Sequence, residues 1–299
     1  MLIVDTDLEE LNDDAFALHF LLASGRVPDL VTTIFGNTTP QRSAALGRQN
    51  FPVPVSPGAA VPLDWTHDRA SALRAAVEAL PRGAYVAGLA ADGPLFAASR
   101  HDMGPASADI AGRLSGDRAA TVLALGPLTN VAEACRGTAP GSLARHDLLF
   151  CGGSLETGNM TAFSEFNAFA DAEAVNVALA GNWRSVTVVP LDVTATVDFG
   201  EPEIERLAAS GSAFGKAVAA AYTGRSLMWD VVAAVLYLRP DVIRQSRTLR
   251  LKALTEPPHF GRLVPAEPPV PEVTVITDVD AGAVREIFVR AFEEATDEH

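Results

Sequence analysis

Short apolar runs alternate with longer segments along most of the chain, and this order limits the folds available to it. The runs, which read as buried strands, are Leu2–Val4, Leu30–Phe35, Thr121–Leu125, Leu148–Cys151 and Val186–Leu191. Between them, segments such as Asp13–Leu22 and Asp171–Ala180 carry apolar residues at helical spacing. A repeating strand–helix order predicts an α/β protein with an open, mostly parallel, Rossmann-like sheet flanked by helices.

The second half of the chain has a more helical pattern. Helices are expected over Glu203–Ala221, Trp229–Leu238 and Ala281–Ala295, and a late strand over Val273–Ile276. The proline-rich stretch Pro265–Pro271 has the composition of a surface loop. No repeat or linker divides the sequence, so we expect residues 1–299 to form a single domain.

Composition and charge exclude several partners. The formal net charge is -14, which disfavours nucleic acid polymers and anionic membranes but attracts cations. The longest apolar run, Val231–Leu238, is too short to span a bilayer, and the N-terminus lacks the basic region of a secretory signal. Cys135 and Cys151 have neither metal-binding nor redox spacing. A cytoplasmic protein with reduced thiols is therefore expected.

Polar residues follow the predicted strands at the points where these end. They are Asp5 and Asp7, Asn37, Gly126, Gly152 and Gly153, and Asp192. In open parallel sheets, ligands bind beyond the carboxyl ends of the strands. The positions therefore indicate a single site at one edge of the sheet.

Four aspartates, Asp5, Asp7, Asp13 and Asp14, lie within ten residues around the first strand-to-helix turn. Ionised carboxylates this close repel one another, and a hard cation removes the repulsion. Calcium accepts about 6–8 oxygen ligands in irregular geometry, whereas zinc would favour His or Cys, which the cluster lacks. The alternative is a solvated turn in which Asp13 and Asp14 favour a helix N-terminus.

Further motifs give this cluster a context. The pattern D-T-D followed by D-D-A resembles that of the inosine-uridine nucleoside hydrolase family. Similar motifs follow in order: VTTIFGN at 31–37, ALGPLTNVAEA at 124–134, GGSLETGN at 152–159, SEFNAFADAEA at 164–174, PLDVT at 190–194 and MWD at 228–230. The resemblance runs from residue 2 to about residue 240. It implies the nucleoside hydrolase fold, a bound Ca²⁺, a nucleoside substrate and hydrolysis of its N-glycosidic bond.

The resemblance also implies residue roles. Carboxylates of Asp7, Asp14 and Asp230 and the backbone carbonyl of Leu125 would ligate calcium, and Asp7 would also act as the general base. The residues implied to hold the ribose are Asp13, Asn37, Asn159, Glu165 and Asn167. Simpler explanations exist for several of them: Asn37 and Asn159 follow glycines and suit turns, whereas Glu165, Asn167 and Asp230 suit helix ends. Asp192 could support the site or only end its strand.

Trp229 departs from the family pattern, because many relatives have a His there as proton donor to the leaving base. Tryptophan cannot act as such an acid, but it can stack on a base, as in a purine-preferring branch of the family. We therefore expect a preference for purine nucleosides, with Trp229 binding the base; its alternative role is a core aromatic at a helix start. A second aromatic wall could come from Trp65, Tyr85 or Phe96.

Other features are less informative. Glu9 and Glu10 stand where the family usually has small residues, and Leu46–Leu95 matches poorly. The histidines without motif context, expected at the surface, are His67, His101 and His259. Relatives are commonly dimers or tetramers, which implies a homo-oligomer.

Two alternative functions remain. A phosphohydrolase of the haloacid dehalogenase type also has D-x-D after its first strand, but it requires a later Lys and a further acidic pair that do not occur here in order. A riboside-binding protein with little or no catalytic activity on the same fold would explain the missing His and the altered loop at Glu9 and Glu10.

Overall fold

The computed structural model describes residues 1–78, 98, 104–222 and 228–294. Two of the candidate aromatic residues, Tyr85 and Phe96, lie outside the described residues, as does His101. Trp65 is half-buried, and His259 is exposed. No helix in the described ranges is long and apolar enough to cross a membrane.

One eight-stranded sheet organises the structure. Its order is β3-β2-β1-β4-β5-β6-β10-β7. The strands are β1 (Leu2–Thr6), β2 (Leu30–Thr33), β3 (Val55–Pro57), β4 (Thr121–Ala124), β5 (Asp147–Cys151), β6 (Ser185–Val189), β7 (Ile243–Leu249) and β10 (Val273–Val279). All neighbouring pairs are parallel except β10 and β7, so the predicted open, mostly parallel sheet is confirmed. A separate antiparallel pair joins β8 (Leu251–Ala253) to β9 (Leu263–Pro265).

The chain reverses its direction of progress across the sheet at β1. It adds β2 and β3 on one side of β1, and then β4, β5 and β6 on the other side. Asp5 consequently pairs with Thr32 of β2 and with Ala124 of β4. Loops leaving β1 and β4 diverge at such a point, which opens a crevice at the carboxyl ends of the strands.

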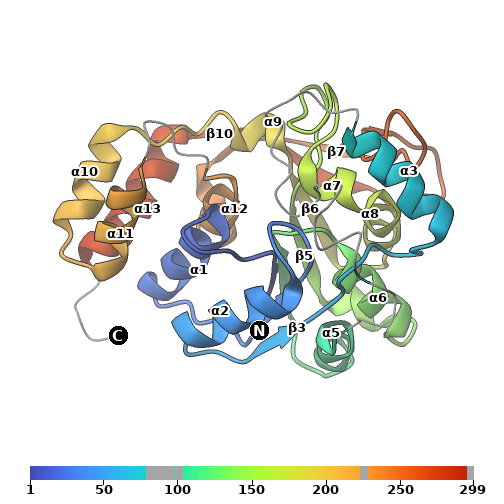
Figure 1. The fold of residues 1–299 in the computed structure, drawn as a ribbon, viewed down its shortest axis with the longest axis horizontal. Coiled ribbons are helices and arrows are strands. Elements are labelled where there is room, and N and C mark those ends of the chain that lie inside the picture. The colour runs from blue at the N-terminus through green and yellow to red at the C-terminus, as the bar shows by residue number, and fades with distance from the viewer. Residues whose placement is uncertain (79–97, 99–103, 223–227, 295–299) are drawn as a thin grey trace.

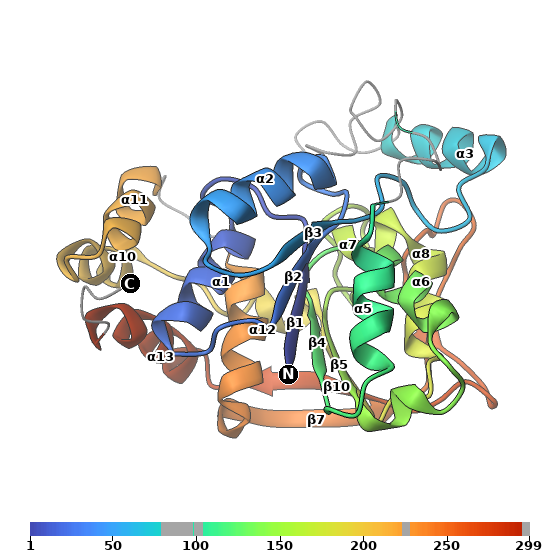
Figure 2. The same cartoon turned by 90° about the horizontal axis from the view of Figure 1, so that it is seen from below.

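Helices cover both faces of the sheet (Figures 1 and 2). Side chains along β1 point alternately to the two faces of the sheet, and both faces are apolar: Leu2 and Val4 belong to one apolar cluster and Ile3 to another. The first cluster includes residues of α1 (Asp13–Ala23), α12 (Trp229–Leu238) and α13 (Ala281–Glu294). The second includes residues of α5 (Ala106–Leu114), α6 (Thr129–Gly137) and α8 (Ala172–Leu179).

The remaining helices belong to the connections between the strands. They are α2 (Pro40–Asn50), α3 (His67–Glu78), α7 (Phe166–Ala170), α9 (Leu191–Thr194), α10 (Glu201–Ala209) and α11 (Ala213–Ala221), with 3₁₀ turns η2 (Ser142–Arg145) and η3 (Pro240–Val242). The single helix expected over Glu203–Ala221 is two helices, α10 and α11. Gly211 between them has φ +85°, a left-handed conformation that ends a helix.

Candidate active site

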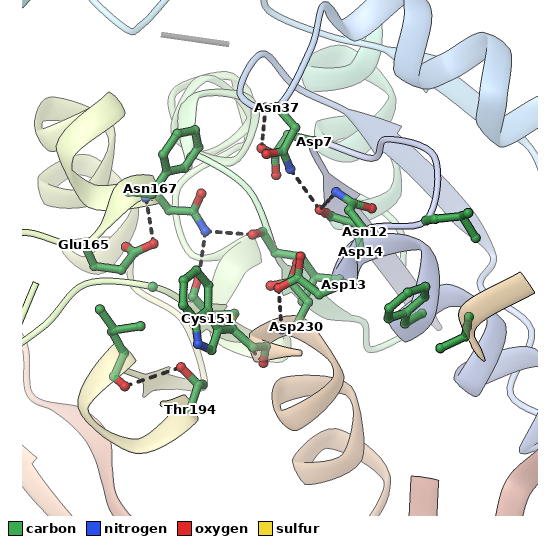
Figure 3. Close-up of a pocket in the computed structure, with 18 of the residues that line it drawn as sticks. Asp7, Asn12, Asp13, Asp14, Asn37, Cys151, Glu165, Asn167, Thr194 and Asp230 are labelled. Carbon is green, nitrogen blue, oxygen red and sulfur yellow. Dashed lines mark hydrogen bonds between the residues drawn. The ribbon is translucent and has the colours of Figure 1, made fainter. Parts of the chain in front are cut away.

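A cavity of about 260 Å³ lies at the carboxyl edge of the sheet, beside the point where β1 and β4 diverge. Its polar side comes from the loop after β1, the first turns of α1 and α12, and the segment around Glu165 (Figure 3). Its apolar side includes Phe16, Ile204, Val218 and Tyr222. The cavity thus places a group of carboxylates opposite an apolar wall.

Helices α1 and α12 pack against each other, and this packing brings their first turns together. Asp13, Asp14 and Asp230 each have a carboxylate oxygen within 4.8 Å of the others. The backbone N–H of Asp230 donates to Asp13 Oδ2 at 3.4 Å. Helix N-termini favour nearby negative charge, although by no more than about 2 kcal/mol each.

Asp14 is held by three donors. Its Oδ1 accepts a hydrogen bond from the Thr6 hydroxyl. Its Oδ2 accepts from Asn12 Nδ2 at 2.7 Å and from Asn37 Nδ2 at 3.3 Å. The side chain is buried, so its orientation is fixed before any ligand binds.

Asp7 lies on the other side of the cluster. It is buried, and its Oδ2 accepts the backbone N–H of Asn37 at 2.8 Å. Gly36 is required for this approach, because a Cβ there would lie 2.1 Å from Asp7 Oδ2. Asn37 therefore contacts both Asp7 and Asp14 from the loop after β2.

Glu165 and Asn167 form a rigid unit at the start of α7. Glu165 accepts backbone N–H groups of Gly153 at 2.6 Å, Asn167 at 2.8 Å and Ala168 at 3.2 Å. Asn167 Nδ2 donates to the carbonyl of Leu125 at 2.7 Å and to that of Cys151 at 3.0 Å. The ends of β4 and β5 are thereby tied to this unit.

Burial and mutual repulsion raise the pKa of the clustered acids. Burial raises the pKa of Asp13 to about 6, and burial with repulsion from Asp13 raises the pKa of Asp14 to about 7. The pKa values of Asp7 and Asp230 are also well above the usual range, first through burial and then through neighbouring aspartates. Burial likewise raises the pKa of Glu165 to about 7.

The donor set fits a divalent cation. Five carboxylates line the cavity, those of Asp7, Asp13, Asp14, Glu165 and Asp230, and its described lining includes no Lys, Arg or His. Such a group ionises fully only with a counter-charge, and calcium prefers oxygen ligands.

The structure brings most of the predicted site residues together. Those that line the cavity are Asp7, Asp13, Asp14, Asn37, Leu125, Glu165, Asn167, Trp229 and Asp230. Asn159 is not among them, although both polar atoms of its side chain are buried and have no partner among the described residues. Asp192 lies outside as well; it accepts the backbone N–H groups of Leu155, Glu156 and Thr157 at 2.7–3.0 Å and so holds the segment before Asn159.

Sequence reasoning missed several residues of the site. Thr6 and Asn12 hold Asp14, and Asn12 could have been suspected from its place before a helix. Asp5 makes no cavity contact; its Oδ1 accepts from Thr32 at 2.6 Å and from Asn130 at 2.9 Å. The apolar wall from α10 and α11 has no motif that would reveal it.

The fold and the cavity together define an α/β protein with the nucleoside hydrolase fold. A plant nucleoside hydrolase, the PpNRh1 enzyme, superposes with a TM-score of 0.74 at 23% identity over 98% of both chains. A purine-preferring ribonucleoside hydrolase from Gardnerella vaginalis gives 0.72 at 20% identity, again over 98% of both. The family described as inosine-uridine preferring nucleoside hydrolase matches residues 2–286, and this chain belongs to it. The family expected from the motifs is thus confirmed.

Curated relatives extend the comparison. The pyrimidine-specific ribonucleoside hydrolase RihA of Shewanella sp. (strain MR-4) is 30% identical over 227 residues, which are 71% of this chain. The non-specific ribonucleoside hydrolase RihC of Salmonella paratyphi B is 29% identical over 202 residues, 64% of this chain and 61% of that protein. The chain spans 66% of the length of the RihA relative.

Proposed function

We propose that this chain is a calcium-dependent ribonucleoside hydrolase that cleaves the N-glycosidic bond, prefers purine nucleosides and releases free base and ribose. The observation that carries the proposal is the set of five carboxylates around one cavity, with no basic side chain in its described lining. In this proposal Asp7, Asp14, Asp230 and the Leu125 carbonyl hold the cation. Asp13 also has an oxygen within reach of Asp14 and Asp230.

A divalent ion held by these residues would supply positive charge that offsets the carboxylates and would lower the pKa of a nearby water. In this proposal Asp7, which lines the cavity, accepts a proton from the attacking water. The water oxygen bonds to the anomeric carbon, and the electron pair of the broken C–N bond leaves with the base, which takes up a proton from solvent while Asp7 returns its own to solvent.

The ribose side of the site supports this chemistry. Asp13, Asn37, Glu165 and Asn167 line the cavity from three connections of the sheet. Asparagine amides both donate and accept, as sugar hydroxyls require. Asn159 lies outside the lining, but both polar atoms of its amide lack a partner among the described residues, and in this proposal they serve the same purpose. Negative oxygens near the ring stabilise the oxocarbenium-like transition state.

On the base side of the cavity, Trp229 supports the preference for purine nucleosides. This residue is half-buried, starts α12 beside Asp230 and lines the cavity. Phe16 and Tyr222 add aromatic surface to the same cavity. The relatives differ on this point, because the two named above as pyrimidine-specific and purine-preferring act on different bases. The proposed purine preference therefore rests on Trp229 and not on the relatives.

The test is a nucleoside panel. Purified protein with Ca²⁺ is incubated with inosine, guanosine, adenosine, uridine and cytidine, and free base and ribose are measured. We expect the protein to release ribose from purine nucleosides. Chelation should abolish this release, and Asp7→Ala should lower its rate by at least about 100-fold. Tight riboside binding without turnover would instead identify a binding protein, and faster release from pyrimidine nucleosides would overturn the purine preference.

A further inference from the structure

We propose that Asn12 is a positioning residue that sets the cation affinity of the site by holding the carboxylate of Asp14. The inference rests on the proposed function, because it concerns the cation expected there. No motif assigns Asn12 a role. It stands where the loop after β1 joins α1, and it lines the cavity (Figure 3).

Both ends of the Asn12 amide are engaged. Its Oδ1 accepts the backbone N–H of Ala15 at 3.1 Å, which makes Asn12 the N-cap of α1. Its Nδ2 donates to Asp14 Oδ2 at 2.7 Å. Because the amide is planar, capping the helix with the oxygen also fixes the direction of the nitrogen. One side chain therefore couples the start of α1 to the orientation of Asp14.

The other donors to Asp14 cannot replace this contact. A carboxylate offers about four acceptor positions, two on each oxygen. Thr6 donates to Oδ1, and Asn37 donates to Oδ2 at 3.3 Å, a longer contact than that of Asn12. Without Asn12, Oδ2 would lose its 2.7 Å contact and keep the longer one from Asn37, so the carboxylate would be held less firmly against rotation about its Cβ–Cγ bond. Groups that orient metal ligands typically change metal affinity by about 10–100-fold.

The loop that presents Asn12 is held in one conformation. Leu8 is buried in the core, and its carbonyl accepts the Ser43 hydroxyl at 2.7 Å. Leu11 has φ +53°, a left-handed conformation that costs a branched side chain about 1–3 kcal/mol. Such a conformation persists only where its surroundings impose it. The anchor at Leu8 and the cap at Asn12 bracket Leu11 from both sides.

Two variants separate the donor from the cap. Asn12→Ser keeps a good N-cap but replaces the amide N–H that reaches Asp14 with a hydroxyl on a shorter side chain. Asn12→Gly costs only a few tenths of a kcal/mol of capping and has no side-chain donor at all. Calcium affinity is measured by titration calorimetry on protein freed of metal, with the Tm of the metal-free protein as a measure of folding. We expect the calcium Kd to rise about 10–100-fold in both variants while the metal-free Tm changes by only a few degrees.

The matched control is Thr66→Ala. Thr66 Oγ accepts the backbone N–H of Arg69 at 3.1 Å at the start of α3, and Thr66 does not line the cavity. Its loss should lower the Tm without changing the calcium Kd. An unchanged Kd in both Asn12 variants overturns the role of Asn12 and leaves the proposed function intact. A raised Kd in Thr66→Ala as well would reduce the Asn12 effect to general destabilisation and overturn it. No calcium binding by the parent protein would overturn the proposed function itself.

Discussion

The proposed base preference depends on a single residue, Trp229. Stacking of a base on an aromatic ring is worth about 1–3 kcal/mol, which corresponds to roughly 5- to 150-fold. We predict that Trp229→Ala lowers kcat/KM for inosine or guanosine within that range and leaves the calcium Kd unchanged. Trp229→Phe should restore part of the loss. Equal purine turnover in Trp229→Ala and the parent would refute stacking.

The buried amide of Asn159 gives a second test at this scale. Burying a polar group without a partner costs about 1–3 kcal/mol, and both polar atoms of Asn159 are in that state among the described residues. We predict that Asn159→Leu leaves the Tm equal or higher and raises KM for the nucleoside about 2- to 12-fold, since a lost hydrogen bond costs about 0.5–1.5 kcal/mol. A lower Tm with unchanged KM would give Asn159 a structural role only. Thermal unfolding and initial-rate kinetics supply both readouts.

The carboxylate side of the site could be predicted from the sequence, because its residues stand in motifs that follow one another in a fixed order. Asp7, Asp14 and Asp230 stand in motifs, and all three line the cavity. Thr6 and Asn12 were missed because their roles depend on which carboxylate oxygen they reach, and no spacing encodes that distance. Tyr222 was missed because an apolar wall is made by any residue of suitable size.

At the scale of elements, the connection between β2 and α2 shows how strand ends control the site. A Cβ on Gly36 would collide with the Asp7 carboxylate at 2.1 Å. We predict that Gly36→Ala lowers turnover by at least about 10-fold, because misplacing a reacting group by 1 Å can cost that much or more. The control is Gly112→Ala in α5, where a Cβ meets nothing within 4 Å. It should keep full activity, and a similar loss in both variants would contradict the steric argument.

Elements with a strong periodic pattern were predicted, and those stabilised by their neighbours were not. The apolar strands β1, β4 and β5 stand out in the sequence because both of their faces are buried. Strand β7 has the sequence IRQSRTL and is mostly exposed, and it is a strand because it pairs with β10. The break between α10 and α11 depends on Gly211. Apolar periodicity in a single sequence does not show where such a break falls.

At the scale of the whole molecule, the buried acids predict an unusual pH dependence. Burial raises the pKa of Asp13 to about 6 and those of Asp14 and Glu165 to about 7, above the unfolded values near ~4. Between about pH 5 and 7 the folded, metal-free protein therefore binds more protons than the unfolded chain, so its free energy of unfolding falls as pH rises. The acids that Arg206 and Arg290 hold at a low pKa, such as Glu286 at about 2, are already ionised in this range.

Calcium should reverse this trend, because it binds the ionised carboxylates. We predict that the Tm of chelated protein declines from pH 5 to 8, and that the gain in Tm on adding Ca²⁺ grows over the same range. Thermal unfolding at fixed ionic strength, with chelator or with excess Ca²⁺, measures both. A chelated protein whose Tm rises steadily from pH 5 to 8 would contradict the assignment of these acids.

The meeting of α1 and α12 has a consequence for the motions of the chain. Asp13 and Asp230 are 217 positions apart, yet they share one hydrogen bond and one carboxylate cluster. A cation bound by Asp14 and Asp230 would link the first turns of both helices across this separation, and local opening of either helix would then require its release. In a hydrogen-exchange experiment, the amides in the first turns of both helices would slow together on calcium addition, while those of α5 on the opposite face would keep their rates.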